Sequence, residues 1–170
     1  MRLPAAIISA LLFAAPLAAT TAPAHADDAS PPAAPAMDAR GNSFLGRAQD
    51  LVLNAMGFMG IPYRWGGATP ETGFDCSGFV QFVFRQATGV LLPRSSFEQI
   101  RQGVSVMRDE LMPGDLVFFN TMRATASHVG IYIGENRFIH SPSRGKTVEI
   151  GDITSGYWQA RYDGARRLPL

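Results

Sequence analysis

Apolar residues recur at helical spacing in two parts of the first hundred residues. Asn42 or Ser43 can cap a first helix, whose apolar positions continue at three- and four-residue intervals as far as Met59. A second helical pattern runs over residues 76–88 and ends at a glycine. Residues 93–102 predict a short third helix, so the N-terminal half of the ordered chain is expected to be helical.

Beyond Gly103 the pattern changes to short apolar and β-branched runs, which are typical of strands. A turn at residues 134–136 joins two of these runs into a predicted hairpin. Helices followed by antiparallel strands predict an α+β domain, with the helices on one face or end of a sheet of about five or six strands. The predicted strands are residues 116–119, 128–133, 137–141, 147–150 and a last segment around 165–168.

Composition divides the chain into three parts. Residues 1–26 resemble a secretory signal, with Arg2 at the start, an apolar stretch, and small residues before a cleavage point. The stretch is too short and alanine-rich for a permanent membrane span, although a disordered alanine-rich tail is an alternative. Residues 27–41 are Ala/Pro-rich and predict a flexible linker. Residues 42–170 match one domain that is long enough for a single core.

Charge narrows the class of partner. The formal net charge of the chain is +1, and loss of residues 1–26 would remove one arginine, which leaves a balance near zero. A nucleic-acid binder needs a concentrated basic face, so nucleic acid is not an expected partner. No cysteine stands at the predicted cleavage point for a lipid anchor. We therefore expect an exported, soluble periplasmic protein with no membrane span in its mature form.

Cys76 is the only cysteine of the chain, and it stands where a glycine-rich loop meets the second predicted helix. An exported protein with one thiol has no intramolecular disulfide partner for it, so the thiol is expected to be reactive or to form an intermolecular link. Unpaired N–H groups and the positive end of the helix dipole would favour a thiolate there. A buried cysteine that acts only as a small apolar group is the alternative, but its neighbours Asp75 and Ser77 argue against it.

Three histidines occur in the chain, and His25 belongs to the predicted signal. His128 and His140 lie on the two strands of the predicted hairpin, at similar distances from its turn, and would be near neighbours. A cysteine hydrolase needs a thiolate, an imidazole base and a third group that orients the base. Cys76, His128 as base and His140 as orienting group would supply all three. Two unrelated strand histidines, or a zinc site built from the three residues, remain alternatives.

Several segments of the domain occur in an order typical of a known family, and together they are specific. From about Ser43 to its end the domain resembles the NlpC/P60 cysteine peptidases of bacterial cell walls. Its tail, around residues 157–167, is especially similar to the spr-type murein endopeptidases of Gram-negative bacteria. The matching segments are 63–67, 75–80, 92–95, 113–119, 128–134 and 138–140.

The resemblance implies a papain-like fold and a set of catalytic roles. Cys76 would be the nucleophile, His128 the base and His140 the third member of the triad. Tyr63 would lie beside the thiol and polarise the oxyanion or position the nucleophile. Family members hydrolyse peptide bonds in the stems or cross-links of peptidoglycan, so peptidoglycan is the expected partner. No metal or other cofactor is expected.

Four further residues are candidates for substrate binding. In some relatives the residues that match Asp75 and Ser77 bind a free stem-peptide amine. Arg94 could contact a substrate carboxylate or be a surface arginine at a helix start. Trp65 could line the cleft or pack in the core. Residues 27–41 are too short for the extra binding domain found in relatives that act on short stem peptides, which favours polymeric peptidoglycan.

The resulting prediction is a monomeric cysteine endopeptidase of peptidoglycan. An amidase or acyltransferase on the same residues is an alternative, because water or an amine can resolve one acyl-enzyme. An inactive wall-binding domain is another, because fold alone does not give function. The sequence leaves open which bond is cleaved, and whether an adaptor or a protease regulates the protein.

Overall fold

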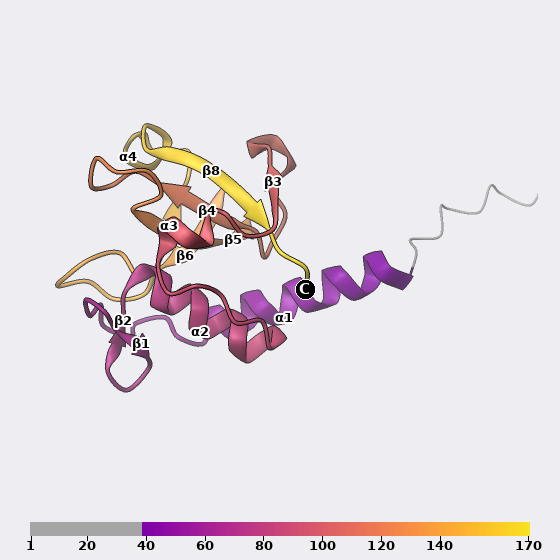
Figure 1. The fold of residues 1–170 in the computed structure, drawn as a ribbon, viewed down its shortest axis with the longest axis horizontal. Helices are drawn as coiled ribbons and strands as arrows, with labels where there is room; N and C mark the ends of the chain where they lie inside the picture. The colour runs from indigo at the N-terminus through magenta and orange to yellow at the C-terminus, as the bar shows by residue number, and fades with distance from the viewer. Residues whose placement is uncertain (1–38) are drawn as a thin grey trace, which may run out of the picture. The chain divides into compact units, whose positions relative to one another are not determined.

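The computed structural model describes residues 39–170, so the predictions for residues 1–26, and for the linker up to residue 38, fall outside it. Helices α1 (Ala39–Met56) and α2 (Cys76–Thr88) pack against each other and cover one face of the main sheet (Figure 1). The predicted cap at Asn42 or Ser43 is wrong, because α1 runs through both positions. Helix α2 begins and ends where its apolar pattern does.

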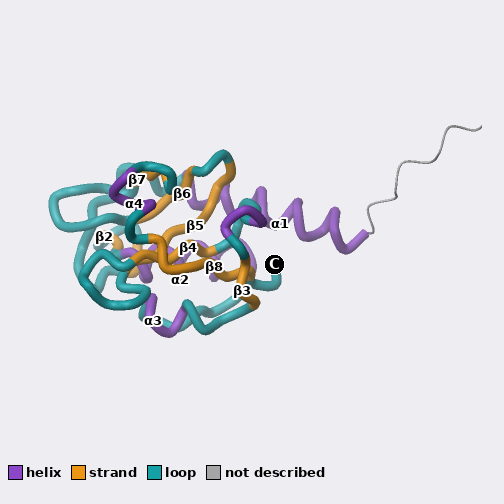
Figure 2. Tube along the Cα trace, turned by 90° about the horizontal axis from the view of Figure 1, so that it is seen from above, coloured by secondary structure: helices purple, strands orange, loops and turns teal. Residues whose placement is uncertain are grey.

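The main sheet has six strands, each antiparallel to its neighbours, in the order β3-β8-β4-β5-β6-β7. Figure 2 shows this sheet from above, with the short edge strand β3 beside β8. The sequence did not indicate β3, because three mostly exposed residues give too short a pattern. The strands are β3 (Val104–Val106), β4 (Leu116–Phe119), β5 (His128–Gly134), β6 (Arg137–His140), β7 (Glu149–Asp152) and β8 (Tyr162–Arg167).

Alternate strand residues supply two separate apolar cores, as the two-residue period of a strand requires. Leu116, Phe118 and Val129 belong to the core beneath α1 and α2. Phe119 and Phe138 belong to a second core on the opposite face, which is partly covered by α4 (Gly156–Gln159). The same alternation sets the histidines on this second face, beside the aromatic residues of β4 and β6.

A small two-stranded sheet leads the chain into α2. It consists of β1 (Ala68–Thr69) and β2 (Gly73–Phe74), and neither strand is long enough for the sequence to have indicated it. Gly78 lies so close to the loop that a side-chain carbon there would come within 2.1 Å of the Gly67 carbonyl oxygen. Only glycine permits this contact, so the Gly67 loop fits tightly against the start of α2.

The chain between α2 and β4 contains α3 (Ser96–Gln99) and the 3₁₀ helix η1 (Arg108–Glu110). The predicted third helix is thus a single turn within residues 93–102. No helix within residues 39–170 has the length and apolar character needed to cross a membrane.

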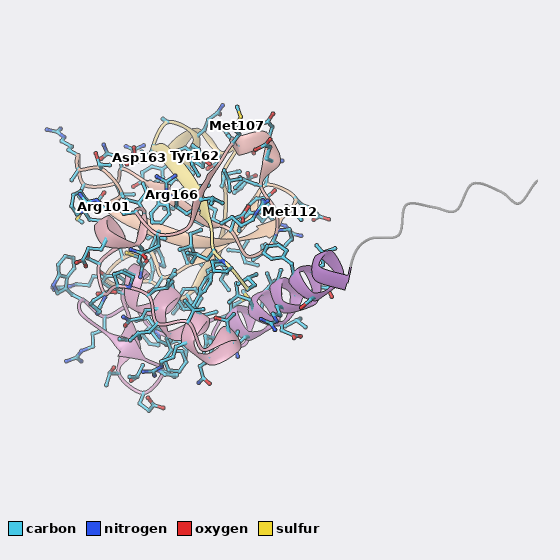
Figure 3. The ribbon with its side chains drawn as sticks, turned by 45° about the vertical axis from the view of Figure 1, so that its right-hand side comes forward. Arg101, Met107, Met112, Tyr162, Asp163 and Arg166 are labelled. Atoms are coloured by element: carbon cyan, nitrogen blue, oxygen red, sulfur yellow. The ribbon has the colours of Figure 1, made fainter. Side chains whose placement is uncertain are left out.

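Polar contacts fix β8 within the sheet, and Figure 3 shows Tyr162, Asp163 and Arg166 along this strand. Arg166 donates to the carbonyl oxygen of Ile100. Asp163 accepts a hydrogen bond from the backbone N–H of Ala126, in the loop before β5. This contact helps to hold the loop that leads to His128.

Candidate active site

Cys76 is the first residue of α2 and lines a cavity of about 980 Å³. Its side chain is half-buried. Asp75 caps the helix, because its Oδ1 accepts a hydrogen bond of 2.7 Å from the Gly78 N–H. The structure therefore places the thiol at a helix start, as expected, and in a cavity. The other predicted site residues on the cavity wall are Tyr63, Trp65, Asp75, Ser77, Arg94 and His128.

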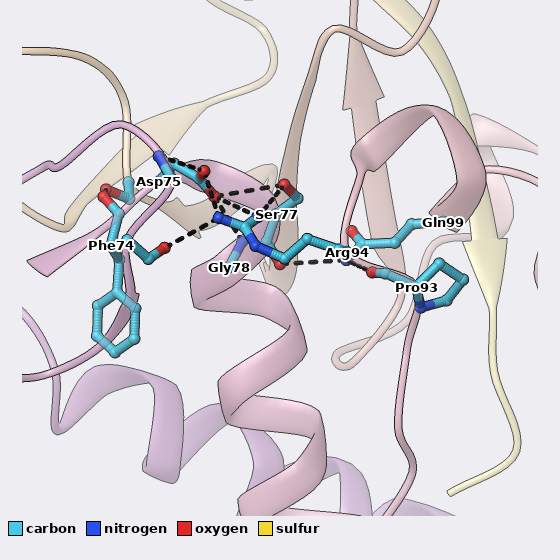
Figure 4. A network of polar contacts seen from close by, with 10 residues as sticks. Phe74, Asp75, Ser77, Gly78, Pro93, Arg94 and Gln99 are labelled. Atoms are coloured by element: carbon cyan, nitrogen blue, oxygen red, sulfur yellow. Dashed lines mark hydrogen bonds and ion pairs between the residues drawn. The ribbon is translucent and has the colours of Figure 1, made fainter.

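The Asp75 carboxylate has five donors from the chain itself, several of which are drawn in Figure 4. Arg94 makes a bidentate contact with it, Nη1 to Oδ1 at 2.9 Å and Nη2 to Oδ2 at 2.6 Å. Gly66 donates to Oδ2 at 2.9 Å, and the Ser77 hydroxyl to Oδ1 at 3.3 Å. Because such charge-assisted pairs are comparatively strong, Asp75 and Arg94 hold the turn that carries the nucleophile.

Two buried polar residues, which sequence reasoning missed, also fix this turn. The Gln99 side chain donates to the carbonyl oxygens of Pro93 at 2.8 Å and Ser77 at 3.1 Å, and so joins the Arg94 segment to α2 (Figure 4). The Ser141 hydroxyl donates to the Phe74 carbonyl at 2.7 Å and joins the end of β6 to the residue before Asp75. Both are single polar residues near apolar ones, and the sequence gives no sign of their partners.

The structure brings His128 and His140 together. His128 lies farther from the hairpin turn than His140, so the strand register sets His140 opposite Gly130, two residues along from His128, rather than directly opposite His128. The rings still meet, with Nε2 of His128 at 2.7 Å from Nδ1 of His140. The exposed fractions of the two residues are 4% and 1%. A diagonal pair across a hairpin is within reach of side chains of this length.

Cys76 and His128 approach the cavity from opposite faces of the sheet. Helix α2 packs against β5, and the backbone N–H of Val129 lowers the pKa of the Cys76 thiol. Because His140 occupies Nε2 of His128, Nδ1 is the ring nitrogen left for the thiol. Tyr63 lines the same cavity, and its pKa is raised by burial, with further contributions from the charges of Cys76 and Asp75.

Burial is the largest cause of the pKa shifts of both Cys76 and His128. It raises the pKa of the Cys76 thiol to about 11, with a further contribution from the Asp75 charge. The backbone N–H groups at the helix start lower that pKa, as the sequence indicated, but by less than burial raises it. Burial also lowers the pKa of His128 to about 4. The expectation that the helix start yields a thiolate is therefore corrected: thiol and imidazole are both neutral in the free protein.

The two histidine rings also limit the tautomer that can act as a base. If Nδ1 of His128 is to accept a proton, its Nε2 must carry one and donate it to Nδ1 of His140. The far nitrogen of His140, Nε2, is buried and has no hydrogen-bond partner among the described residues. Burial, the charge of His128 and that of Lys146 hold the pKa of His140 well below its ordinary value. His140 therefore stays neutral and acts as an acceptor.

Residues 39–170 contain no group of three or more His, Cys, Asp and Glu side chains arranged to hold a metal ion. Nε2 of His128 and Nδ1 of His140 are hydrogen-bonded to each other, so only Nδ1 of His128 and the buried Nε2 of His140 remain as ring nitrogens without a partner in this pair. The arrangement suits proton transfer between a thiol and an imidazole.

Sequence comparison finds one matching family and several named relatives. Residues 60–167 match the model of the NlpC/P60 family. The chain is 46% identical over 126 residues to murein DD-endopeptidase MepH of Escherichia coli K12, with coverage of 72% of this chain and 46% of the relative. It is 50% identical over 109 residues to murein DD-endopeptidase MepS/murein LD-carboxypeptidase of the same organism, with coverage of 64% and 56%.

A third relative has a different named activity. The gamma-DL-glutamyl hydrolase of Bacillus subtilis 168 is 46% identical over 119 residues, with coverage of 69% of this chain and 29% of the relative. The match thus spans between 29% and 56% of the length of these three relatives.

Solved structures share the fold. A crystal structure of an NlpC/P60 family protein from Bacillus cereus ATCC 10987 has a TM-score of 0.66 and 39% identity, and the match covers 72% of this chain and 40% of that one. The NlpC/p60 domain of the peptidoglycan hydrolase SagA has a TM-score of 0.63 and 33% identity, with coverage of 71% and 98%. The predicted α+β fold with helices on an antiparallel sheet is confirmed.

Proposed function

The chain belongs to the NlpC/P60 family, and on that premise we propose that it is a cysteine endopeptidase that hydrolyses peptide bonds in peptidoglycan. One observation carries the proposal: Cys76 and His128 line one cavity, and His128 is hydrogen-bonded to the buried His140. The names of two relatives, which are murein endopeptidases, support the substrate class.

In the proposed reaction Nδ1 of His128 takes the thiol proton as the Cys76 sulfur attacks the scissile carbonyl carbon. The carbon–nitrogen bond then breaks, His128 returns the proton to the leaving amine, and a thioester remains on Cys76. A water molecule gives a proton to His128 and attacks the thioester, which releases the acid and restores the thiol. Because both groups start neutral, charge separates only as the substrate reacts.

The other predicted residues have proposed roles around this step. Tyr63 would donate to the oxyanion or position the sulfur, because it lines the same cavity as Cys76. Asp75 and Ser77 would contribute mainly by holding the nucleophile turn. The Arg94 side chain is 41% exposed and could still offer an N–H group to a substrate carboxylate. Trp65 is 73% exposed on the cavity rim and would contact the substrate rather than pack in the core.

Digestion of purified peptidoglycan tests the proposal. We expect the protein to release peptides or to split cross-linked muropeptides, as seen in their masses, and Cys76→Ser to abolish this while its unfolding curve stays close to that of the wild type. Retained hydrolysis in that variant would sink the proposal. Binding to the polymer with no change in mass would instead support the inactive wall-binding domain.

The same digestion distinguishes the bond that is cut. Loss of cross-links indicates an endopeptidase of the kind named for the two Escherichia coli relatives, whereas cleavage after γ-linked glutamate indicates the kind named for the Bacillus subtilis one. A soluble amine added in excess separates hydrolysis from acyl transfer, because transfer adds the mass of the amine to the product.

We also propose that residues 1–26 direct export, and that the mature chain acts in the periplasm as a monomer. The pattern of one basic residue, an apolar stretch and a small-residue cleavage point supports export. Deletion of residues 1–26 should leave the protein in the cytoplasmic fraction. Equal periplasmic yield with and without them would contradict the proposed signal.

A further inference from the structure

Aromatic packing holds the histidine pair, and Trp158 of α4 is its common neighbour. The indole stacks on the His128 ring, with centroids 5.4 Å apart and an interplanar angle of 27°. It meets the His140 ring edge to face, at 4.9 Å and 88°. It also contacts Phe119 at 4.8 Å and Phe138 at 5.1 Å. Trp158 therefore touches both imidazoles and the two phenyl rings beside them.

Hydrogen bonds alone do not fix the orientation of the pair. The rings share one hydrogen bond, and Nε2 of His140 has no partner among the described residues. Gly151 of β7 lies against that nitrogen, since a side-chain carbon there would come 3.3 Å from it and 2.6 Å from Phe138. A ring with a single hydrogen bond can rotate about it, so packing has to set the ring planes.

Trp158 is also well placed to keep water from the hydrogen bond between the rings. It is half-buried and lines the cavity, whereas His140 does not. Its backbone is anchored nearby, because the Arg161 N–H donates to the Trp158 carbonyl and the Asn120 N–H donates to the Arg161 carbonyl at 2.8 Å, at the end of β4. The indole thus lines the open cavity on one side and contacts the buried His140 ring on the other.

We propose that Trp158 is a positioning residue that fixes the ring plane of His128 and excludes water from its hydrogen bond to His140, so that Nδ1 of His128 remains directed to Cys76. This inference rests on the proposed function of the site. A hydrogen bond is stronger where water is excluded, and a misplacement of about 1 Å in a catalytic group can cost about 10²-fold in rate.

Other charged groups around the rings do not provide this control. His140 on β6 is hydrogen-bonded to His128, Cys76 on α2 lines the same cavity as His128, and both are neutral in the free protein. Lys146, whose charge acts on His140, is engaged by Glu149 at 3.1 Å. Among the described aromatic residues, Phe138 contacts His140 at 4.7 Å and Phe119 contacts His128 at 6.3 Å, whereas Trp158 contacts both imidazoles.

Kinetics on cross-linked muropeptides gives the first test. For Trp158→Ala we expect kcat to fall by about 10²-fold with little change in KM, and for Trp158→Phe we expect most of kcat to return. Tyr162→Leu is the matched control: Tyr162 contacts Phe119 at 6.0 Å in the same core but touches neither histidine, so its kcat should match the wild type. Equal kcat in wild type and Trp158→Ala would overturn the inference, as would an equal loss in Tyr162→Leu.

A second measurement does not depend on activity. The ring nitrogen signals of labelled histidine report tautomer and protonation, and His128→Gln and His140→Gln variants assign them. We expect one His128 tautomer in the wild type and in Trp158→Phe, but mixed tautomers and a raised His128 pKa in Trp158→Ala, because water would reach the ring. A single tautomer in all three proteins contradicts the inference.

The experiments distinguish failure of the proposed function from failure of the proposed role of Trp158. If the wild type hydrolyses no peptidoglycan, the proposed function fails, while the tautomer comparison still decides the role of Trp158. If Trp158→Ala does not fold, Trp158→Leu serves in both measurements, because leucine keeps apolar volume but has no flat ring to stack on His128.

Discussion

At the residue scale, opposing effects set the pKa of the Cys76 thiol. Backbone N–H groups of Ser77, Val129 and Cys76 itself favour the thiolate, whereas burial and the Asp75 charge oppose it. The helix start was visible in the sequence, but the burial of the sulfur was not, because it depends on β5 and on the loops around the cavity. The chemistry of the nucleophile is therefore set by tertiary packing as much as by its place on the helix.

The charge of Asp75 can be removed with little change in shape. In Asp75→Asn the Cys76 pKa should fall, since one cause of its rise is lost and the Arg94 charge is left without its partner. The rate of alkylation by iodoacetamide, measured against pH, reports the thiolate. Arg94→Met should shift that pH dependence the other way, because the Asp75 charge then acts without compensation. A shift of the alkylation pH dependence in the same direction for both variants would contradict the opposing effects of Asp75 and Arg94.

The protonation of His128 should set the pH at which activity is lost on the acid side. Its pKa is lowered to about 4 by burial, and the imidazole must be neutral to accept the thiol proton. We therefore expect kcat/KM to persist well below the ordinary histidine pKa of about 6.5 and to fall as the pH approaches 4. The profile of kcat/KM for a soluble muropeptide checks this. An acid limb centred near the ordinary pKa would show that His128 is not desolvated.

At the element scale, the sequence predicted the elements that carry their own periodicity. Helix α2 and strand β4 match their patterns, and the β5-β6 hairpin was located with its turn. Strands β1 and β2 and helix α4 were missed, because elements of two to four residues are stabilised by contacts with the rest of the fold. The same limit applies to the site: residue type and spacing indicated Cys76 and the histidines, but not Trp158, whose partners come from other strands.

Ser141 shows how two elements are kept in register. Its hydroxyl is buried and joins β6 to the end of β2, so Ser141→Ala leaves the Phe74 carbonyl without this donor. The loss of a buried partner costs roughly 1–3 kcal/mol of unfolding free energy, which urea titration would measure. We also expect kcat to fall, because Phe74 precedes the nucleophile turn.

Ser155→Ala is the control for this change. Ser155 precedes α4, and its side chain makes no capping hydrogen bond. Its unfolding free energy should therefore stay within about 0.5 kcal/mol of the wild type. A cost for Ser141→Ala no larger than that of Ser155→Ala would mean that the link between β6 and β2 does not stabilise the fold.

At the scale of the whole domain, the two imidazoles are buried and the thiol is half-buried. Helix α2 presents the thiol from one face of the sheet, and β5 and β6 present the imidazoles from the other. All three groups are neutral in the folded state, with pKa values displaced away from neutrality. The site therefore contributes to the pH dependence of folding as well as to catalysis.

The sign of that dependence is fixed by the direction of each shift. Below the unfolded histidine pKa of 6.5, the unfolded chain binds protons that buried His128 does not bind until about pH 4, so stability falls as the pH falls through this window. Above the unfolded cysteine pKa of 9, the unfolded chain loses a proton that Cys76 keeps until about pH 11, so stability falls again. From these groups, stability is greatest between 6.5 and 9.

Urea titrations across pH test this, and each group can change the slope by at most about 1.4 kcal/mol per pH unit. Relative to the wild type, Cys76→Ala should reduce the slope of the unfolding free energy against pH above pH 9. His128→Gln should reduce that slope below pH 6.5. Because His140 shares the acid window, the acid side should keep part of its slope in His128→Gln. Wild-type stability that stays constant from 9 to 11 would mean that the Cys76 thiol is not buried in solution, and the neutral thiol–imidazole pair would then have to be abandoned.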